Sequence, residues 1–508
     1  MSASSSPNRS DDAPDQEAAQ TPLTEGGWAP EPSHSHRFGE RAEWATQLAF
    51  PFAAIICAVT LLLTQTVNND DIFITLECAR NLAAGDGFVF NPSEYELGVT
   101  NPLVGLLAAA ITWALPTTLV GAAWAISLLS LLGAIYAFRW AMDDGLWALA
   151  FVPLLFLGPQ TSHYVGNEFP LVCALGFTAI GATRRGMPLT AGLCVGLLYL
   201  ARFDAVLLGP ILVVRLFITH RWRAVAPVAM LACGAAPIIV LWHLVVWRTY
   251  GQLFPHSLDA TVHGFETSMR FGEVVLRVLL PQMLLTGNAL VALLLILGLV
   301  TMAGRCWEIL AWGALHFAFS VALDLPGLKP WHYMFVYLAL MVPTAAGAAV
   351  LARRLALDGF AAAGLVVGLG FVIGLQDFDN AKEEDRFAFY KEISAWIRSS
   401  TSPDESIGLE EIGIIGFHTP NRIIDLGHLV TPPVMRVAVD AEGNAHERWP
   451  TRAESAEDYR PAFIVHRYFP ELGIDGFSDF TGYEETARLT SPAGHFHAAI
   501  LTRDDLIP

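Results

Sequence analysis

Residues 205–246 read AVLLGPILVVRLFITHRWRAVAPVAMLACGAAPIIVLWHLVV, which is two apolar runs joined by a short basic turn. The runs, Ala205–Ile218 and Ala224–Val246, contain a single charged residue, Arg215, and the turn His220–Arg223 contains two arginines. An apolar helix of about 20 residues crosses a membrane, and basic turns stay on the cytoplasmic side. This stretch therefore predicts a helical hairpin that crosses a membrane twice.

Similar apolar runs recur from residue 44 to residue 375, so the same reading extends to most of the chain. The run Pro102–Leu115 is bounded by prolines and is shorter than a span, and we interpret it as a re-entrant or lateral helix. The other predicted spans are Trp44–Val67, Leu119–Trp140, Gly145–Gly158, Phe169–Thr183, Leu189–Ala201, Leu284–Ala303, Ile309–Leu323, Met334–Leu351 and Phe360–Leu375. The predicted fold is an all-α polytopic membrane domain of about 11 helices, followed by a small α/β domain.

The charges support this division of the 508 residues. Apolar residues make up 54% of the chain and charged residues only 15%, against about 25% in soluble domains. The net charge of −18 divides into −5 for residues 1–45, −1 for 46–375 and −12 for 376–508. A nearly uncharged centre between polar ends is typical of a multi-pass membrane protein, and the acidic balance argues against nucleic acid as a partner.

Three regions follow from these patterns. Residues 1–43 are rich in Ser, Pro, Ala and acids without an apolar period, which predicts a disordered cytoplasmic tail. The first apolar run starts too late for a cleavable signal peptide. Residues 44–375 form the predicted membrane domain with an outer loop at 68–118, and residues 376–508 the extracytoplasmic domain.

The orientation follows from the basic residues. With eleven spans and a cytoplasmic N-terminus, the cytoplasmic connections receive nine Lys and Arg residues and the outer connections six. The pairs Arg184-Arg185 and Arg353-Arg354 then both face the cytoplasm, whereas counting Pro102–Leu115 as a span would turn them outward. We therefore expect the protein in the plasma (inner) membrane, with the loop 68–101 and the C-terminal domain outside.

The C-terminal region shows the alternation of a small α/β domain. An amphipathic helix is expected over Asp377–Trp396, because apolar residues recur there at intervals of three or four. The predicted strands are Ile407–Leu409, Ile412–Phe417, Arg422–Leu426, Phe463–His466 and His497–Thr502. The region lacks a phosphate-binding loop and a catalytic triad motif, so we expect it to cover a site rather than to form one.

The first outer loop carries the strongest chemical signal. Asp70 and Asp71 directly follow the first span, at the start of a predicted amphipathic helix along the membrane surface that ends near Gly85. One interpretation is that Asp70 caps this helix while Asp71 is solvated. The other is that one carboxylate acts as a general base, because adjacent like charges resist joint ionisation and raise one pKa.

This loop resembles the first loop of GT-C integral-membrane glycosyltransferases, in particular the terminal arabinofuranosyltransferases of cell-wall arabinan synthesis. The resemblance rests on segments whose order and spacing are kept. They are Asp70–Thr75, Ala79–Leu82, Gly85, Gly87, Val89–Pro92, Glu94, Gly98–Leu103 and, less specifically, Gly166–Leu171, Leu200–Asp204, Arg248–Gly251, Pro255–Ser257, Gly413–His418 and Arg422–Leu429. Departures from the family pattern are Leu97 in place of a glutamate, His256 in place of an asparagine, and Lys329 with His332 in place of an arginine.

The resemblance implies a hexosyl- or pentosyltransferase that uses a polyprenyl-phosphate sugar and a glycan, lipid or protein acceptor of the cell envelope. It implies Asp70 or Asp71 as catalytic base, with Asp70 favoured because it stands nearer the span. The substrate-binding residues that it implies are Arg80, Glu94, Glu96, Thr100, Asn101, Glu168, Arg202, Asp204, Arg248, Tyr250, His256, Lys329 and His332. A divalent cation held by Asp70 and Asp71 is compatible with this scheme, although no motif requires one.

Two other functions remain open from the sequence. A transporter or flippase for lipid-linked glycans would more often show internal repeats and ionisable residues at mid-membrane. Here we find no repeat, and the charged residues cluster at the span ends on one side. A non-catalytic scaffold with the same fold is the third reading. Several charged residues also have structural interpretations: Arg202 and Asp204 as a local ion pair, Glu168 as a helix-start acid, and Arg248 as an interfacial anchor.

Overall fold

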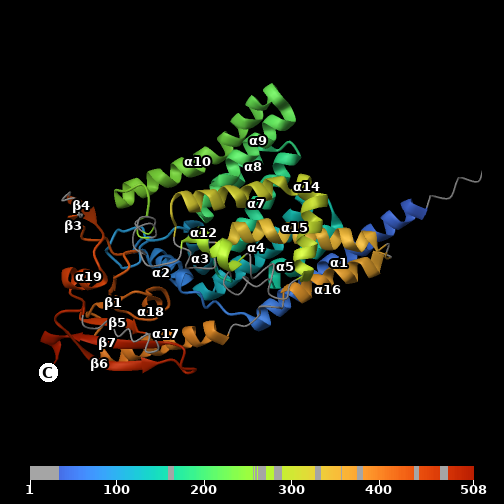
Figure 1. The fold of residues 1–508 in the computed structure, drawn as a ribbon. Coiled ribbons are helices and arrows are strands. Elements are labelled where there is room, and N and C mark those ends of the chain that lie inside the picture. Colours follow the sequence, from blue (N-terminus) through green and yellow to red (C-terminus); the bar gives the residue numbers. More distant parts are fainter. Residues whose placement is uncertain are drawn as a thin grey trace, which may run out of the picture.

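The computed structural model describes residues 34–157, 165–255, 257, 260, 270–279, 289–325, 333–355, 357, 359–374, 381–439, 445–468 and 479–507. Helices dominate up to residue 374, and the strands gather at one end of the helical bundle (Figure 1). The helices are α1 (His34–Thr64), α2 (Asp70–Ala84), α3 (Pro102–Ala114), α4 (Leu119–Met142), α5 (Gly145–Leu157), α7 (Phe169–Arg184), α8 (Pro188–Ala201), η1 (Phe203–Leu207), α9 (Leu208–His220), η2 (Arg221–Ala224), α10 (Val225–Tyr250), α12 (Phe271–Val274), η3 (Val275–Leu279), α14 (Ala289–Ala322), α15 (Met334–Arg354) and α16 (Gly359–Gly374).

The apolar runs fold as helices close to their predicted positions. Among the described residues, four helical stretches are long and apolar enough to cross a membrane: Leu119–Met142, Phe203–Tyr250, Ala289–Ala322 and Met334–Arg354. Shorter apolar helices, including Pro102–Ala114, pack among them. The polytopic, mostly helical fold predicted from the sequence is therefore confirmed.

Two boundaries differ from the prediction. Helix α1 begins at His34, so residues 34–43, expected in the disordered tail, are helical. The spans predicted on either side of Cys306 form the single element α14, which bends where the backbone of Cys306 is non-helical (φ −120°, ψ 18°). The bend replaces the predicted loop because Cys306 is buried and its thiol contacts the carbonyl of Met302 within the same helix.

Small residues allow the central helices to approach closely. A Cβ atom at Gly298 of α14 would lie 1.8 Å from the carbonyl oxygen of Pro343 in α15, and one at Gly347 would lie 1.8 Å from that of Leu294. Glycine is therefore required at both contacts, as is usual where membrane helices pack backbone to backbone. This packing fixes α14, which supplies one wall of the candidate site described below.

Two buried carboxylates, Glu308 and Asp144, form ion pairs that connect helices of the bundle. Glu308 of α14 accepts from Arg184 (2.7 Å) and lies 3.3 Å from Arg215, while Asp144 contacts Arg305 (3.2 Å) and Arg353 (2.5 Å). The sequence assigns these residues to cytoplasmic connections or, for Arg215, to the part of a span beside one. The structure thus brings Arg184 and Arg215 to one acid and Arg305 and Arg353 to another.

Topology can be measured directly. Reporter fusions after Arg185, Arg223 and Arg354 are expected to report cytoplasm, because the sequence assigns their basic clusters to cytoplasmic connections. Fusions at Glu94 and Asp404 are expected to report the outer side. An outer signal at Arg223 together with one at Glu94 would contradict the eleven-span orientation.

The C-terminal domain begins with α17 (Ala381–Ser400) and contains a mixed five-stranded sheet in the order β2-β1-β5-β7-β6. Strand β1 pairs in parallel with β2 and β5, and β7 pairs antiparallel with β5 and β6. Helix α19 packs beside the sheet, and β3 with β4 forms a separate hairpin. The elements are β1 (Ile407–Leu409), α18 (Gly413–Phe417), β2 (Ile423–Asp425), β3 (Arg436–Val439), β4 (Ala445–Arg448), α19 (Arg452–Tyr459), β5 (Phe463–Tyr468), β6 (Tyr483–Thr490), β7 (His497–Arg503) and η8 (Asp504–Leu506).

One predicted strand is wrong. Residues 412–417 were expected to be extended because of their apolar β-branched run, but Gly413–Phe417 forms the short helix α18. Helix α18 packs against α2 of the membrane domain rather than joining the sheet. A long-range contact therefore outweighs the local strand propensity of the isoleucines.

Candidate active site

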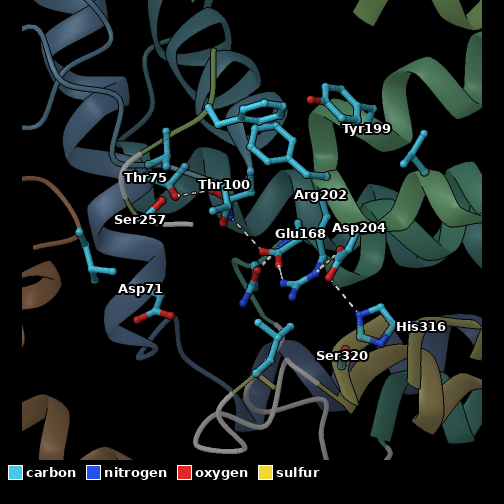
Figure 2. A pocket seen from close by; sticks show the side chains of 18 of the residues that line it. Asp71, Thr75, Thr100, Glu168, Tyr199, Arg202, Asp204, Ser257, His316 and Ser320 are labelled. Atoms are coloured by element: carbon cyan, nitrogen blue, oxygen red, sulfur yellow. Dashed lines mark hydrogen bonds and ion pairs between the residues drawn. The ribbon is translucent and has the colours of Figure 1, made fainter. Parts of the chain in front are cut away.

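A cavity of about 350 Å³ lies where α2, the turn before α7, η1 and α14 meet. Figure 2 shows Asp71 on one side, His316 on the other, and Arg202 with Glu168 between them. Its polar lining residues are Asp71, Thr75, Thr100, Asn101, Asn167, Glu168, Tyr199, Arg202, Asp204, Ser257, His316 and Ser320. Apolar residues such as Phe203, Phe271 and Leu325 complete the wall.

A continuous chain of hydrogen bonds joins polar residues that line this cavity. The hydroxyl of Thr75 donates to Asn101 (2.7 Å), and the Asn101 amide donates to Glu168 (3.0 Å). Arg202 donates to Glu168 (2.7 Å) and to Asp204 (2.8 Å), and Asp204 lies 3.0 Å from Nε2 of His316. The chain joins residues that are up to 241 positions apart in sequence, from α2 to α14.

The local electrostatics are acidic. Arg202 is flanked by the carboxylates of Glu168 and Asp204, and all three side chains are at most 16% exposed. A buried guanidinium between two carboxylates is stabilised by charge-assisted hydrogen bonds on both sides. Its charge is therefore committed to these acids, and the group is more than the local Arg202–Asp204 pair that the sequence suggested.

Asp70 and Asp71 have different environments. Asn69 caps α2 by accepting from the backbone N–H of Asp71 (3.0 Å), and Asp71 is half-buried and lines the cavity. Asp70 is buried and turns toward the C-terminal domain, where its carboxylate accepts from the backbone N–H groups of Gly413 (3.0 Å) and Ile414 (2.7 Å). Asp70 therefore caps α18, not its own helix, and does not line the cavity.

Helix α18 is held against α2 at several further points. A Cβ atom at Gly413 would lie 1.9 Å from the carbonyl oxygen of Asp70, so only glycine permits this approach. Arg80 donates to the carbonyl of Phe417 (2.9 Å), and the rings of Phe73 and Phe417 meet edge to face at 5.2 Å. These contacts fix the helix that carries Asp71.

The rest of the first outer loop is also bound by the C-terminal domain. Asn91 exchanges hydrogen bonds with the backbone of Ile423 (2.9 and 3.0 Å), and Glu94 pairs with Arg422. Leu429 reaches the cavity wall, in a loop whose backbone N–H groups donate to Asp425. The C-terminal domain thus supplies part of the site, although the sequence showed only that it could cover one.

The other predicted substrate-binding residues fall into two groups. Thr100, Asn101, Glu168, Arg202 and Asp204 are brought together at the cavity. Arg80, Glu94, Glu96, Arg248 and Tyr250 are not among its lining residues: Tyr250 donates to the Phe88 carbonyl (2.8 Å), Glu96 accepts from Gln252 (3.4 Å), and Arg248 is exposed on α10. His256, Lys329 and His332 lie outside the described residues.

Sequence reasoning missed several lining residues. His316 and Ser320 occupy an apolar run that was assigned only as a span, and Thr75 lies within the first-loop motif without a chemical role. The signal available for His316 was an imidazole in the middle of a predicted span, where ionisable groups are rare and functional.

The residues present do not form a metal site around the two aspartates. Within the described ranges, no group of three or more His, Cys, Asp or Glu side chains is arranged to hold a metal ion. Asp70 directs its oxygens to the α18 amides, so it does not face the cavity together with Asp71.

Glu77, about two turns beyond the aspartates on α2, is a buried acid at the domain junction. Burial raises the pKa of Glu77 to about 7, although its pairing with Arg80 opposes the shift. The folded state then binds this proton more tightly than the unfolded state, so stability declines as pH rises from about 4.5 to about 7. Arg80 also holds Phe417, so this titration acts on the α2–α18 contact.

We expect Glu77→Gln to flatten the dependence of the melting temperature on pH between about 5 and 7. The wild type should lose up to about 3 kcal/mol across its full titration, and the variant should lose less because the amide does not ionise. Thermal unfolding in lipid nanodiscs measures the effect, with Glu392→Gln on the exposed face of α17 as control. Parallel curves for wild type and Glu77→Gln would show that Glu77 does not control the junction.

Comparison with known proteins identifies the fold. ArnT from Cupriavidus metallidurans in the apo state matches with a TM-score of 0.56 and 13% identity over 91% of this chain and 98% of that chain. ArnT from the same organism bound to undecaprenyl phosphate gives a TM-score of 0.53, with 13% identity over 89% of this chain and 97% of that chain. The Archaeoglobus fulgidus oligosaccharyltransferase in the apo form gives a TM-score of 0.55, with 13% identity over 89% of this chain and 74% of that chain.

These neighbours are members of the GT-C superfamily, and the shared architecture shows that this chain has the GT-C fold. In sequence, residues 378–503 match the family described as Domain of unknown function (DUF8728). No curated protein matches the sequence.

Proposed function

We propose that the protein is a membrane glycosyltransferase that moves a sugar from a polyprenyl-phosphate donor to a cell-envelope acceptor on the extracytoplasmic side. The observation that carries the proposal is Asp71, a half-buried carboxylate that lines a mixed polar and apolar cavity in a GT-C fold. The neighbour bound to undecaprenyl phosphate supports a lipid phosphate as the carrier.

In the proposed reaction an acceptor hydroxyl oxygen attacks the anomeric carbon of the donor. The bond from this carbon to the phosphate oxygen breaks, and polyprenyl phosphate leaves with the electron pair. Asp71 takes the hydroxyl proton as general base. Asp70 is unsuited to this role because both its oxygens accept backbone hydrogen bonds, so we assign the base to Asp71 in place of Asp70.

The leaving phosphate requires cationic partners that Arg202 does not supply, since two carboxylates already neutralise it. We assign this role, on sequence grounds, to His256, Lys329 and His332, with Arg248 as an interfacial contributor. Arg202 instead holds Glu168 and Asp204 in place. Glu168 and Asn101, fixed within the hydrogen-bond chain, are proposed to bind donor or acceptor hydroxyls.

The first-loop motif points to a more specific activity. We propose a pentosyl or hexosyl donor similar to that of the terminal arabinofuranosyltransferases, on the basis of the segments from Asp70 to Leu103. Mass spectrometry of envelope glycans and prenyl-phosphate sugars, with and without the gene, tests this. Loss of one terminal glycan residue with accumulation of its donor is expected, and an unchanged profile would contradict the proposal.

A further inference from the structure

Helix α14 presents two unsatisfied polar groups to the cavity. His316 and Ser320 are four residues apart, so they lie on one face of the helix, and both line the cavity at 1% exposure (Figure 2). Among the described residues, neither Nδ1 of His316 nor Oγ of Ser320 has a hydrogen-bond partner. Buried polar groups are normally paired, so such atoms in a cavity wall indicate where a ligand binds.

The pairing of His316 decides which kind of ligand atom fits. Its Nε2 lies 3.0 Å from Asp204, whose carboxylate can only accept, so Nε2 carries the proton. In the neutral imidazole, Nδ1 then offers a lone pair and needs a donor. A sugar hydroxyl can donate to it, whereas an ionised phosphate oxygen cannot.

The net charge and the aromatic rings beside His316 also favour a sugar. The described ionisable residues beside His316 in the cavity are Asp204, Arg202 and Glu168, which together carry one net negative charge. A phosphate would be repelled here, but a neutral polyol would not. The ring of Phe271 lies 5.9 Å from the imidazole, and Phe319 also lines the cavity, so apolar faces are available to pack on a sugar ring.

We infer that the α14 end of the cavity is the subsite for the transferred sugar, with His316 Nδ1 and Ser320 Oγ bound to its hydroxyls. This inference rests on the proposed glycosyl transfer. It places the sugar hydroxyls against α14, at the end of the cavity away from Asp71 (Figure 2). Specificity for the sugar would then depend on α14 and not only on the first-loop motif.

The test compares donor binding with and without the sugar. Full-length protein in nanodiscs is titrated with short-chain polyprenyl phosphate and with its arabinofuranosyl, mannosyl and glucosyl conjugates. Ser320→Ala should lower the affinity for the conjugate that the wild type binds most tightly by about three- to tenfold. His316→Gln should lower it about tenfold, because each variant loses one hydrogen bond to the sugar. Binding of the bare polyprenyl phosphate should stay within about twofold. Thr301→Ala, which removes an exposed hydroxyl from the same helix, is the matched control.

The outcomes separate this inference from the proposed function. If the variants lose as much affinity for the bare polyprenyl phosphate as for the sugar conjugate, the sugar subsite is overturned and the phosphate is placed at His316. Unchanged binding of every ligand by a folded Ser320→Ala protein, or equal wild-type affinity for the bare phosphate and all conjugates, would also overturn it. A wild type that binds none of the four ligands would instead refute the proposed function, and the subsite with it.

Discussion

Asp71→Asn is expected to lower kcat by about 10²–10⁴-fold while the protein stays folded and binds its donor. The amide keeps the shape of the side chain but cannot take the acceptor proton. Because the lost interaction develops in the transition state, kcat should fall much more than KM rises. Steady-state kinetics of purified protein with a polyprenyl-phosphoryl sugar measure the change.

Asp70→Asn is the matched control, one residue earlier in the same helix. Its amide nitrogen cannot accept from the α18 N–H groups, so one of two backbone bonds to Gly413 and Ile414 is lost. A stability loss of about 1 kcal/mol is expected, as for other helix caps, with only a modest fall in kcat. A greater kcat loss for Asp70→Asn than for Asp71→Asn would return the base to Asp70.

Arg202→Ala is expected to destabilise the folded protein by about 3–5 kcal/mol. The substitution leaves Glu168 and Asp204 buried without their shared cation, and an unpaired buried charge is far more costly than the pair is stabilising. Unfolding in denaturant, followed in a detergent that preserves activity, measures the loss. Arg248→Ala on the exposed side of α10 should change stability by less than about 1 kcal/mol.

A second substitution distinguishes charge from packing. Asp204→Asn added to Arg202→Ala removes one of the two orphaned charges and should recover about 1–2 kcal/mol of stability. A double variant no more stable than Arg202→Ala would mean that the loss comes from packing of the arginine stem and not from charge.

Much of the membrane domain was predictable because its signal is local. An apolar run such as Ala224–Val246 must form a helix inside the membrane, because its backbone N–H and C=O groups find no water there and must bond to one another. The continuous helix through Cys306 was not predictable, because the contacts beside it, such as Glu308 with Arg184, come from distant parts of the chain. Strand β6, with its mostly polar residues at Tyr483–Thr490, was missed for a related reason: only its pairing with β7 identifies it.

The candidate site was predictable in part. The first-loop motif located Asp70 and Asp71, and the later motifs supplied Glu168, Arg202 and Asp204, which the structure gathers around one cavity. The sequence could not separate the two aspartates, because the partner of Asp70 lies 343 residues away in α18. Their different environments follow from which side of α2 meets the C-terminal domain.

The central claim is tested most directly by a transfer assay with purified protein. Nanodisc-embedded enzyme is incubated with polyprenyl-phosphoryl arabinofuranose, mannose or glucose and an envelope glycan acceptor, and the acceptor and lipid are analysed by mass spectrometry. The account predicts that one donor yields an acceptor heavier by one sugar and an equal amount of polyprenyl phosphate, and that Asp71→Asn forms both at least about 10²-fold more slowly. Equal product from wild type and Asp71→Asn, or no consumption of any donor by the wild type, would contradict it.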